Sequence, residues 1–152
     1  MMFIALTVHV LAAVIWIGGM FFAYAILRPS AGPLEPGVRL ALWSRVLSRF
    51  FPWVWLSVAA LLVSGGAMIA LDTTGTAATS TLIRLMMALG LVMIAIYAWV
   101  YFTPWRRLRR TVSTQDWVTA DQHLRKVRFL VGLNLALGVL TVVVGISALL
   151  YG

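Results

Sequence analysis

The chain has 152 residues, of which 62% are hydrophobic and 11% are charged, whereas soluble domains have roughly 45–50% and 25%. One core of this size could not bury so much apolar surface, so the composition excludes a soluble domain and indicates a lipid environment. The absence of cysteine excludes disulfides, iron–sulfur clusters and thiolate metal sites. The net charge of +8 lies beside long apolar runs, which favours anionic lipid head groups over nucleic acid as partner.

Four apolar runs predict transmembrane helices, at about residues 2–27, 51–71, 82–102 and 129–150. The first run has no basic residue ahead of it and exceeds the apolar part of a signal peptide, so we interpret it as a retained helix. Residues 1–152 are therefore expected to form a single membrane domain. The expected fold is all-α, an integral membrane antiparallel four-helix bundle.

Prolines, glycines and polar residues are expected to separate these spans. Prolines and glycines over 28–37 should break the first helix, and Thr103-Pro104 should end the third. Pro52 would lie in the first turn of the second span, where a helix tolerates proline. Residues 72–81 (DTTGTAATST) should form a short polar turn.

The basic residues predict the orientation in the membrane. Eleven of the twelve lie in the first and third loops, and only Arg84 lies near the other side. The positive-inside rule then places both basic loops in the cytoplasm and both termini outside.

The two basic loops also have helical patterns. Over residues 39–50, apolar and basic side chains occupy opposite faces, which indicates either an amphipathic surface helix or a cytoplasmic extension of the second span. Ser113 followed by Asp116 resembles a capping box. Asp121 and Arg125 have the spacing of a helical ion pair.

Small residues within the spans predict helix contacts, because they let helices approach closely where the hydrophobic effect provides no drive between them. The same residues could form a dimer face, and four short spans leave room for a homodimer or a partner membrane subunit. These residues are Gly18, Gly19, Ala23, Ser57, Ser64, Gly65, Gly66, Gly90, Gly132, Gly138 and Gly145.

His9 is the outstanding polar residue within a span. It lies seven residues into the first helix, roughly 10 Å below the outer surface at 1.5 Å per residue. An imidazole at this depth must find a partner. It could bond a neighbouring Ser, Thr or backbone group and serve packing alone, or it could ligate a metal or a haem.

The methionines favour a metal. Five of the seven share the predicted outer leaflet with His9, and they are Met1, Met2, Met68, Met86 and Met87. Thioether sulfur and imidazole nitrogen suit Cu(I), although methionine is also an ordinary filler of helix gaps. A candidate copper site therefore comprises His9, Met68, Met86 and Met87.

Haem b is the alternative cofactor. A haem between helices commonly takes two axial ligands, and this chain has one intramembrane histidine. His9 with a methionine, a five-coordinate haem, or two His9 residues across a dimer remain open. Arg84 is either a snorkelling anchor or a counter-charge for a haem propionate. Asn134 is expected to form an interhelical hydrogen bond, and His123 is expected to be solvated.

The stretch HVLAAVIWIGGMFF (9–22) resembles the first helix of the copper resistance protein D (CopD) family, with His9 followed by Trp16, Gly18 and Gly19. Looser similarity continues through residues 42–66 and 125–145. The resemblance implies a multi-pass protein of the bacterial inner membrane that handles copper, with His9 as ligand and Trp16, Gly18 and Gly19 as structural companions. Many members are larger than this four-helix unit.

A more distant similarity is to the HemJ-type protoporphyrinogen oxidases, which bind haem and have a histidine in the first helix. The lysine expected in their third helix would fall near Arg84, where this chain departs. Three hypotheses follow: a copper-binding protein, a haem-binding redox protein, and a non-catalytic subunit or scaffold in which His9 only packs.

Overall fold

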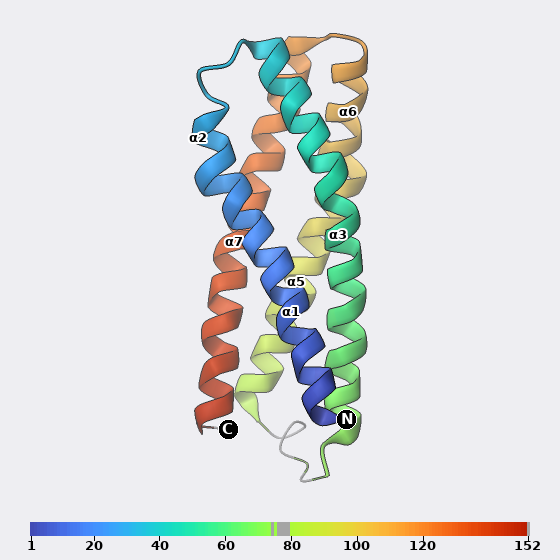
Figure 1. Cartoon of the computed structure of the whole chain (residues 1–152), viewed down its shortest axis with the longest axis vertical. Coiled ribbons are helices and arrows are strands. Elements are labelled where there is room, and N and C mark those ends of the chain that lie inside the picture. Colours follow the sequence, from blue (N-terminus) through green and yellow to red (C-terminus); the bar gives the residue numbers. More distant parts are fainter. Residues whose placement is uncertain (74, 76–79, 152) are drawn as a thin grey trace.

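A computed structural model describes residues 1–73, 75 and 80–151. Within this part of the chain nearly every residue is helical, and the helices form one antiparallel bundle (Figure 1). Four stretches are long and apolar enough to cross a membrane, and they are Met2–Ser30, Pro36–Leu71, Thr81–Ser113 and Trp117–Ala148. The predicted all-α membrane bundle is therefore confirmed.

The elements follow one another along the chain as α1 (Met2–Phe21), the π-helical segment η1 (Phe22–Leu27), α2 (Arg28–Ser30), α3 (Pro36–Leu71), α5 (Thr81–Val100), the π-helical segment η2 (Tyr101–Trp105), α6 (Arg106–Ser113) and α7 (Trp117–Tyr151). Both termini lie at one end of the bundle, which we call the terminal end (Figure 1). The connections α2–α3 and α6–α7 lie at the other end, which we call the basic end.

The helices are longer than the predicted spans, and two proline assignments were wrong. Pro52 lies in the interior of α3, because that helix already begins at Pro36. Pro104 does not end the third helix, since η2 carries the chain through it into α6. A π-helical turn accommodates a local change in the hydrogen-bond ladder, so a proline need not terminate the helix there.

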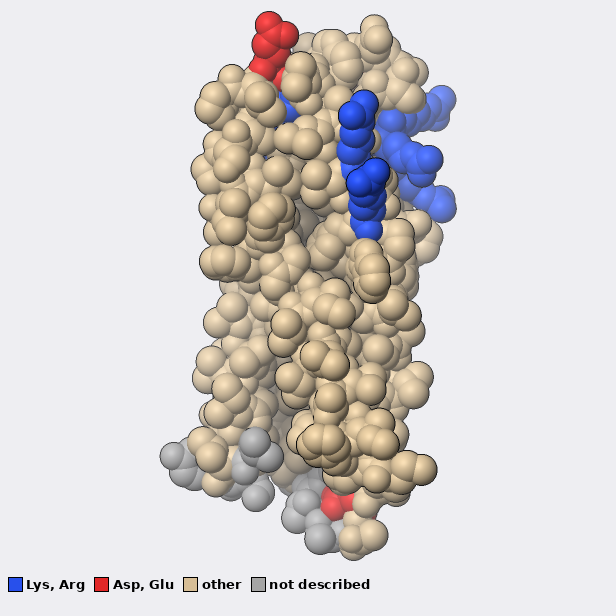
Figure 2. Space-filling view, viewed as in Figure 1, with Lys and Arg blue, Asp and Glu red and all other residues tan. Residues whose placement is uncertain are grey.

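Residues 39–50 form the basic-end part of α3 and thus extend the second span, which decides between the two predicted arrangements. With 36 residues, α3 is about 54 Å long, well beyond the roughly 30 Å of a bilayer's hydrocarbon core. The basic end therefore projects beyond that core. On the face seen in Figure 2, the blue Lys and Arg side chains lie at this end of the bundle.

The capping box predicted at Ser113 and Asp116 was wrong. Ser113 is the last residue of α6 and donates a hydrogen bond to the Arg110 carbonyl. Asp116 instead caps α7 from the preceding position, where its carboxylate accepts a hydrogen bond from the Thr119 amide at 3.2 Å. Hydrogen bonds from Thr119 lower the pKa of Asp116 below its ordinary value. The predicted Asp121–Arg125 ion pair is confirmed, with an N–O distance of 2.8 Å.

The core lies in the middle and basic parts of the bundle. There an aromatic cluster joins α1, α3, α5 and η2 through edge-to-face contacts, which aromatic quadrupoles favour. It comprises Trp16, Phe51, Trp55, Tyr97, Tyr101, Phe102 and Trp105. The Tyr97 hydroxyl donates a hydrogen bond of 3.0 Å to the Phe51 carbonyl and so links α5 to α3.

The predicted small-residue contacts are only partly confirmed. A Cβ atom at Gly19 would overlap the Phe50 ring, and one at Gly132 would lie 2.7 Å from the Tyr24 ring. A Cβ atom at Gly18, Gly66 or Gly90 would have no other side chain within 4 Å. The contact glycines are therefore those on the inward face of each helix, and sequence spacing alone did not distinguish them.

Candidate functional site

His9 lies in α1, two turns from the terminal end, and is half-buried against α3. Its Nδ1 atom lies 2.9 Å from Oγ of Ser64, which is itself buried. The next residue, Gly65, lies beside the ring, since a Cβ atom there would be in ordinary van der Waals contact with His9 Cε1 at 3.5 Å. The first two membrane helices thus hold the imidazole between them.

The contacts of Ser64 define the tautomer of His9. Ser64 Oγ lies 2.6 Å from the carbonyl oxygen of Ala60, one turn earlier in α3. Two oxygens approach this closely only when a proton lies between them, so the hydroxyl donates to that carbonyl. Ser64 Oγ must then accept from His9, which places the imidazole proton on Nδ1. Nε2 of His9 is therefore the unprotonated nitrogen, and its lone pair is available to a metal.

This arrangement is typical of histidines that bind metals. A ligating histidine commonly donates its other ring N–H to a fixed acceptor, which sets the tautomer and the ring orientation. Ser64 provides such an acceptor from a neighbouring helix. The Leu61 backbone, also in α3, is a further polar neighbour of the His9 ring.

The candidate methionines are distributed over two helix pairs. Met68 lies in α3 one turn beyond Ser64 towards the terminal end, and it is half-buried. Residues four apart share a helix face, so Met68 extends the face that carries Ser64. Met86 lies in α5, and its sulfur would lie 3.2 Å from a Cβ atom at Gly145 of α7. Met87 is exposed. Met68 therefore belongs to the α1–α3 pair of His9, and Met86 belongs to the α5–α7 pair.

The predicted companions of His9 have different surroundings. Trp16 is buried and contacts the Tyr97 ring edge-on at a centroid distance of 6.0 Å. Gly19 lies beneath Phe50, whereas Gly18 faces open space. Arg84 is exposed at the start of α5 and donates to the Thr81 hydroxyl at 3.3 Å. Only Trp16 and Gly19 therefore support the packing of α1.

Sequence reasoning overlooked the role of Ser64, which was expected only as a small residue at a helix contact. The sequence did contain an indication of this role. Ser64 lies seven residues before the end of α3, and His9 lies seven residues after the start of α1, so the two side chains are at the same depth. Asn134 also departs from expectation. It is buried, and its Oδ1 atom has no hydrogen-bond partner in the described part of the chain.

The described residues contain no cluster of three or more His, Cys, Asp or Glu side chains that could hold a metal. Fold and site together define a multi-pass membrane protein with a single imidazole fixed between its first two spanning helices. The chain belongs to the copper resistance protein D (CopD) family, whose model matches residues 44–150, more than two thirds of the sequence.

The matched region covers most of α3 and all of the helices that follow it, but it leaves out α1 with His9 and the W-x-G-G motif. It does include Ser64 and the candidate methionines Met68, Met86 and Met87. No curated protein matches the chain significantly, and no solved structure does.

Proposed function

We propose that this protein binds or passes copper as cargo near the outer face of a bacterial inner membrane, with Nε2 of His9 as principal ligand. The observation that carries the proposal is the hydrogen-bonded chain from His9 through Ser64 to the Ala60 carbonyl. It leaves one imidazole nitrogen unprotonated and fixed in direction, as metal ligation requires. Membership of the copper resistance protein D family supports copper as the metal.

Methionine sulfur would complete the coordination. Imidazole and thioether ligands suit Cu(I), and the chain has no cysteine to compete. Met68 is the first candidate because it shares the helix face of Ser64. Met86 and Met87 lie on α5 and would serve a later position in a transfer path, where weak and exchangeable ligands are an advantage.

The haem alternative has no specific observation in its favour. The hydrogen bond between His9 and Ser64 fits a metal ligand and a packed histidine equally well. The scaffold hypothesis differs from the copper proposal in one respect, since it assigns His9 a packing role only. A variant that keeps the Ser64 hydrogen bond but lacks the ligand nitrogen separates the two.

His9→Asn is that variant, because Nδ2 of asparagine occupies the place of the histidine Nδ1 and can still donate to Ser64. The measurement is the Cu(I) affinity of the purified protein in detergent, determined by competition with a chromophoric chelator. We expect His9→Asn to lose Cu(I) binding while the melting temperature stays close to that of the wild type. Thr7→Ala is the matched control, since Thr7 is exposed on the same helix and donates only to the Phe3 carbonyl. Equal Cu(I) affinity in His9→Asn and the wild type would contradict the proposal.

Met68→Leu tests the second ligand. It replaces the sulfur by a side chain of similar volume, so packing should change little. We expect a weaker Cu(I) affinity than in Met20→Leu, in which a buried core methionine is changed in the same way. If both variants bind Cu(I) as the wild type does, Met68 is not a ligand.

A further inference from the structure

A groove lies at the basic end of the molecule, far from His9, between the α5–η2–α6 helix and α7. Its volume is about 590 Å³, within the roughly 300–1,000 Å³ typical of ligand sites. The residues that line it include Trp99, Arg107, His123, Lys126 and Phe129. We propose that this groove binds one anionic phospholipid molecule.

The rim of the groove is cationic. Arg107 comes from α6, whereas Arg125 and Lys126 come from α7, so two helices direct positive charge to one place. Arg125 is held by Asp121 at 2.8 Å. Arg107 and Lys126 form no salt bridge among the described residues. Their charge is therefore available to an anion, and the His123 ring beside them can donate a further hydrogen bond.

The lower part of the groove is apolar. Trp99 and Phe129 are 63% and 71% exposed, which means that neither ring is covered by the rest of the chain. Trp99 lies eight residues before Arg107, about 12 Å further into the membrane at 1.5 Å per residue. Phe129 lies one turn beyond Lys126, in the same direction. The groove therefore changes from cationic to apolar along the bundle axis.

This polarity gradient matches the shape of a phospholipid. A phosphate group at the rim would meet Arg107 and Lys126, and an acyl chain would lie against Trp99 and Phe129. A soluble anion would satisfy only the rim, and a zwitterionic lipid would bring its own cation to the positive side chains. Basic pockets between membrane helices on the cytoplasmic side bind anionic head groups for the same electrostatic reason.

The local backbone contributes to the shape of this site. Thr103 and Pro104 lie in η2, the π-helical segment that joins α5 to α6, and both line the groove. Pro104 is buried. It presents a ring without an N–H group, so this wall of the groove has one backbone donor fewer. The proline that was expected to end the helix thus forms part of the candidate lipid site.

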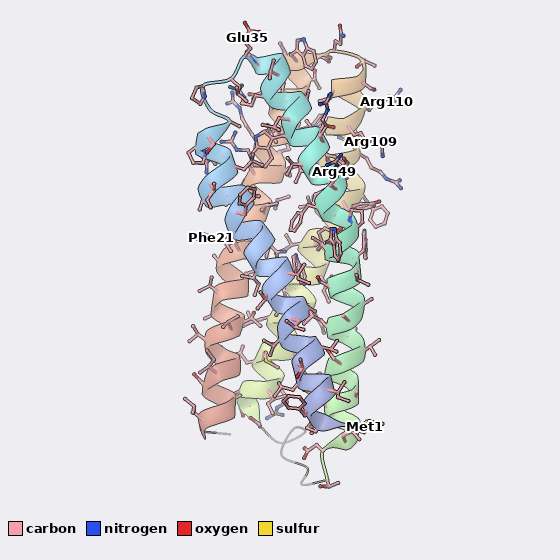
Figure 3. All side chains as sticks on the ribbon, in the orientation of Figure 1. Met1, Phe21, Glu35, Arg49, Arg109 and Arg110 are labelled. Atoms are coloured by element: carbon pink, nitrogen blue, oxygen red, sulfur yellow. The ribbon has the colours of Figure 1, made fainter. Side chains whose placement is uncertain are left out.

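The test uses the full-length protein and a double variant, Arg107→Gln with Lys126→Gln. The matched control is Arg109→Gln with Arg110→Gln, which removes the same charge from exposed side chains that project away from the bundle on α6 (Figure 3). Each protein is exchanged into detergent micelles with phosphatidylglycerol or phosphatidylcholine, and bound lipid is counted by native mass spectrometry at physiological salt.

We expect the wild type and the control to retain one phosphatidylglycerol, and the groove variant to bind it at least about tenfold more weakly, since two cations near the head group are lost. Phosphatidylcholine should bind weakly to all three proteins. Trp99→Ala should reduce retention of phosphatidylglycerol without changing the charge. Equal loss in the groove variant and the control would overturn the proposal, because it would indicate non-specific surface attraction. Displacement of the lipid by millimolar inorganic phosphate or soluble glycerophosphoglycerol would also overturn it.

Discussion

At the scale of single residues, the hydrogen bond from His9 to Ser64 has the largest consequence for chemistry. A histidine in lipid that lacked an acceptor would leave a polar N–H unsatisfied, at a cost of several kcal/mol. Ser64 removes that cost and also decides which nitrogen holds the proton. The same contact therefore makes the residue tolerable in the membrane and available to a metal.

Replacement of Ser64 by alanine should weaken metal binding without abolishing it. The His9 ring would lose its acceptor, and its tautomer and direction would no longer be fixed. We expect the Cu(I) affinity to fall by about 10- to 100-fold, as for other residues that orient a metal ligand. Chelator competition measures the change. Ser57→Ala is the control, because Ser57 is also buried in α3, two turns away. An unchanged affinity in Ser64→Ala would exclude this orienting role.

Tyr97 is a second residue whose hydroxyl links two membrane helices. Tyr97→Phe keeps the aromatic ring and removes the hydrogen bond to the Phe51 carbonyl. We expect a loss of about 0.6 kcal/mol, and at most about 1.7 kcal/mol, in the free energy of unfolding. Reversible unfolding in mixed micelles gives this value. Tyr101→Phe, in the same aromatic cluster, should cost less because no hydrogen bond is described for its hydroxyl.

At the scale of elements, Gly19 marks the tightest glycine contact between α1 and α3. The Phe50 ring lies directly over Gly19, so any side chain there must displace the ring or separate the helices. The neighbouring Gly18 faces away from the bundle. Two adjacent glycines of one motif therefore have different roles, and only the packing distinguishes them.

Gly19→Ala should consequently destabilise the bundle by about 1–3 kcal/mol, the usual cost of overpacking a well-filled contact. Gly18→Ala should be neutral or slightly stabilising, because alanine has the higher helix propensity and no neighbour obstructs its methyl group. Unfolding midpoints of the two variants, compared with the wild type, provide the test. A larger loss for Gly18→Ala would contradict the assigned faces of α1.

At the scale of the whole molecule, charge is distributed very unevenly along the bundle axis. Eleven of twelve basic side chains belong to helices and connections at one end, and Arg84 lies near the other. The positive-inside rule then predicts a cytoplasmic basic end, with His9 near the outer surface. In that orientation the proposed copper site would lie near the outer surface, and the proposed lipid groove would face the inner leaflet.

The orientation can be measured with fusions at the C-terminus. Alkaline phosphatase is active only outside the cytoplasm, whereas green fluorescent protein is fluorescent when it folds inside it. We expect a C-terminal phosphatase fusion to be active and the corresponding fluorescent fusion to be dark. The reverse result would place His9 near the cytoplasmic surface and would contradict the proposed copper site near the outer face.

Much of this architecture could be predicted from local sequence properties. Four apolar runs of spanning length determined the helix number and the antiparallel order, because lipid allows few alternatives for the backbone. The depth of His9 and of the nearby methionines followed from the fixed rise of a helix. Pro52 and Pro104 suggested helix boundaries that are absent from the structure, because long helices continue through both residues.

The sequence by itself determined the class of protein, its membrane spans and the candidate ligand His9, since each of these depends on residues close together in the chain. Only the tertiary structure decided that Ser64 accepts from His9, that Met86 packs on Gly145, and that Arg107 and Lys126 share one groove. These facts depend on the rotation of each helix about its own axis. That rotation is determined by side-chain packing between distant segments, which no local pattern specifies.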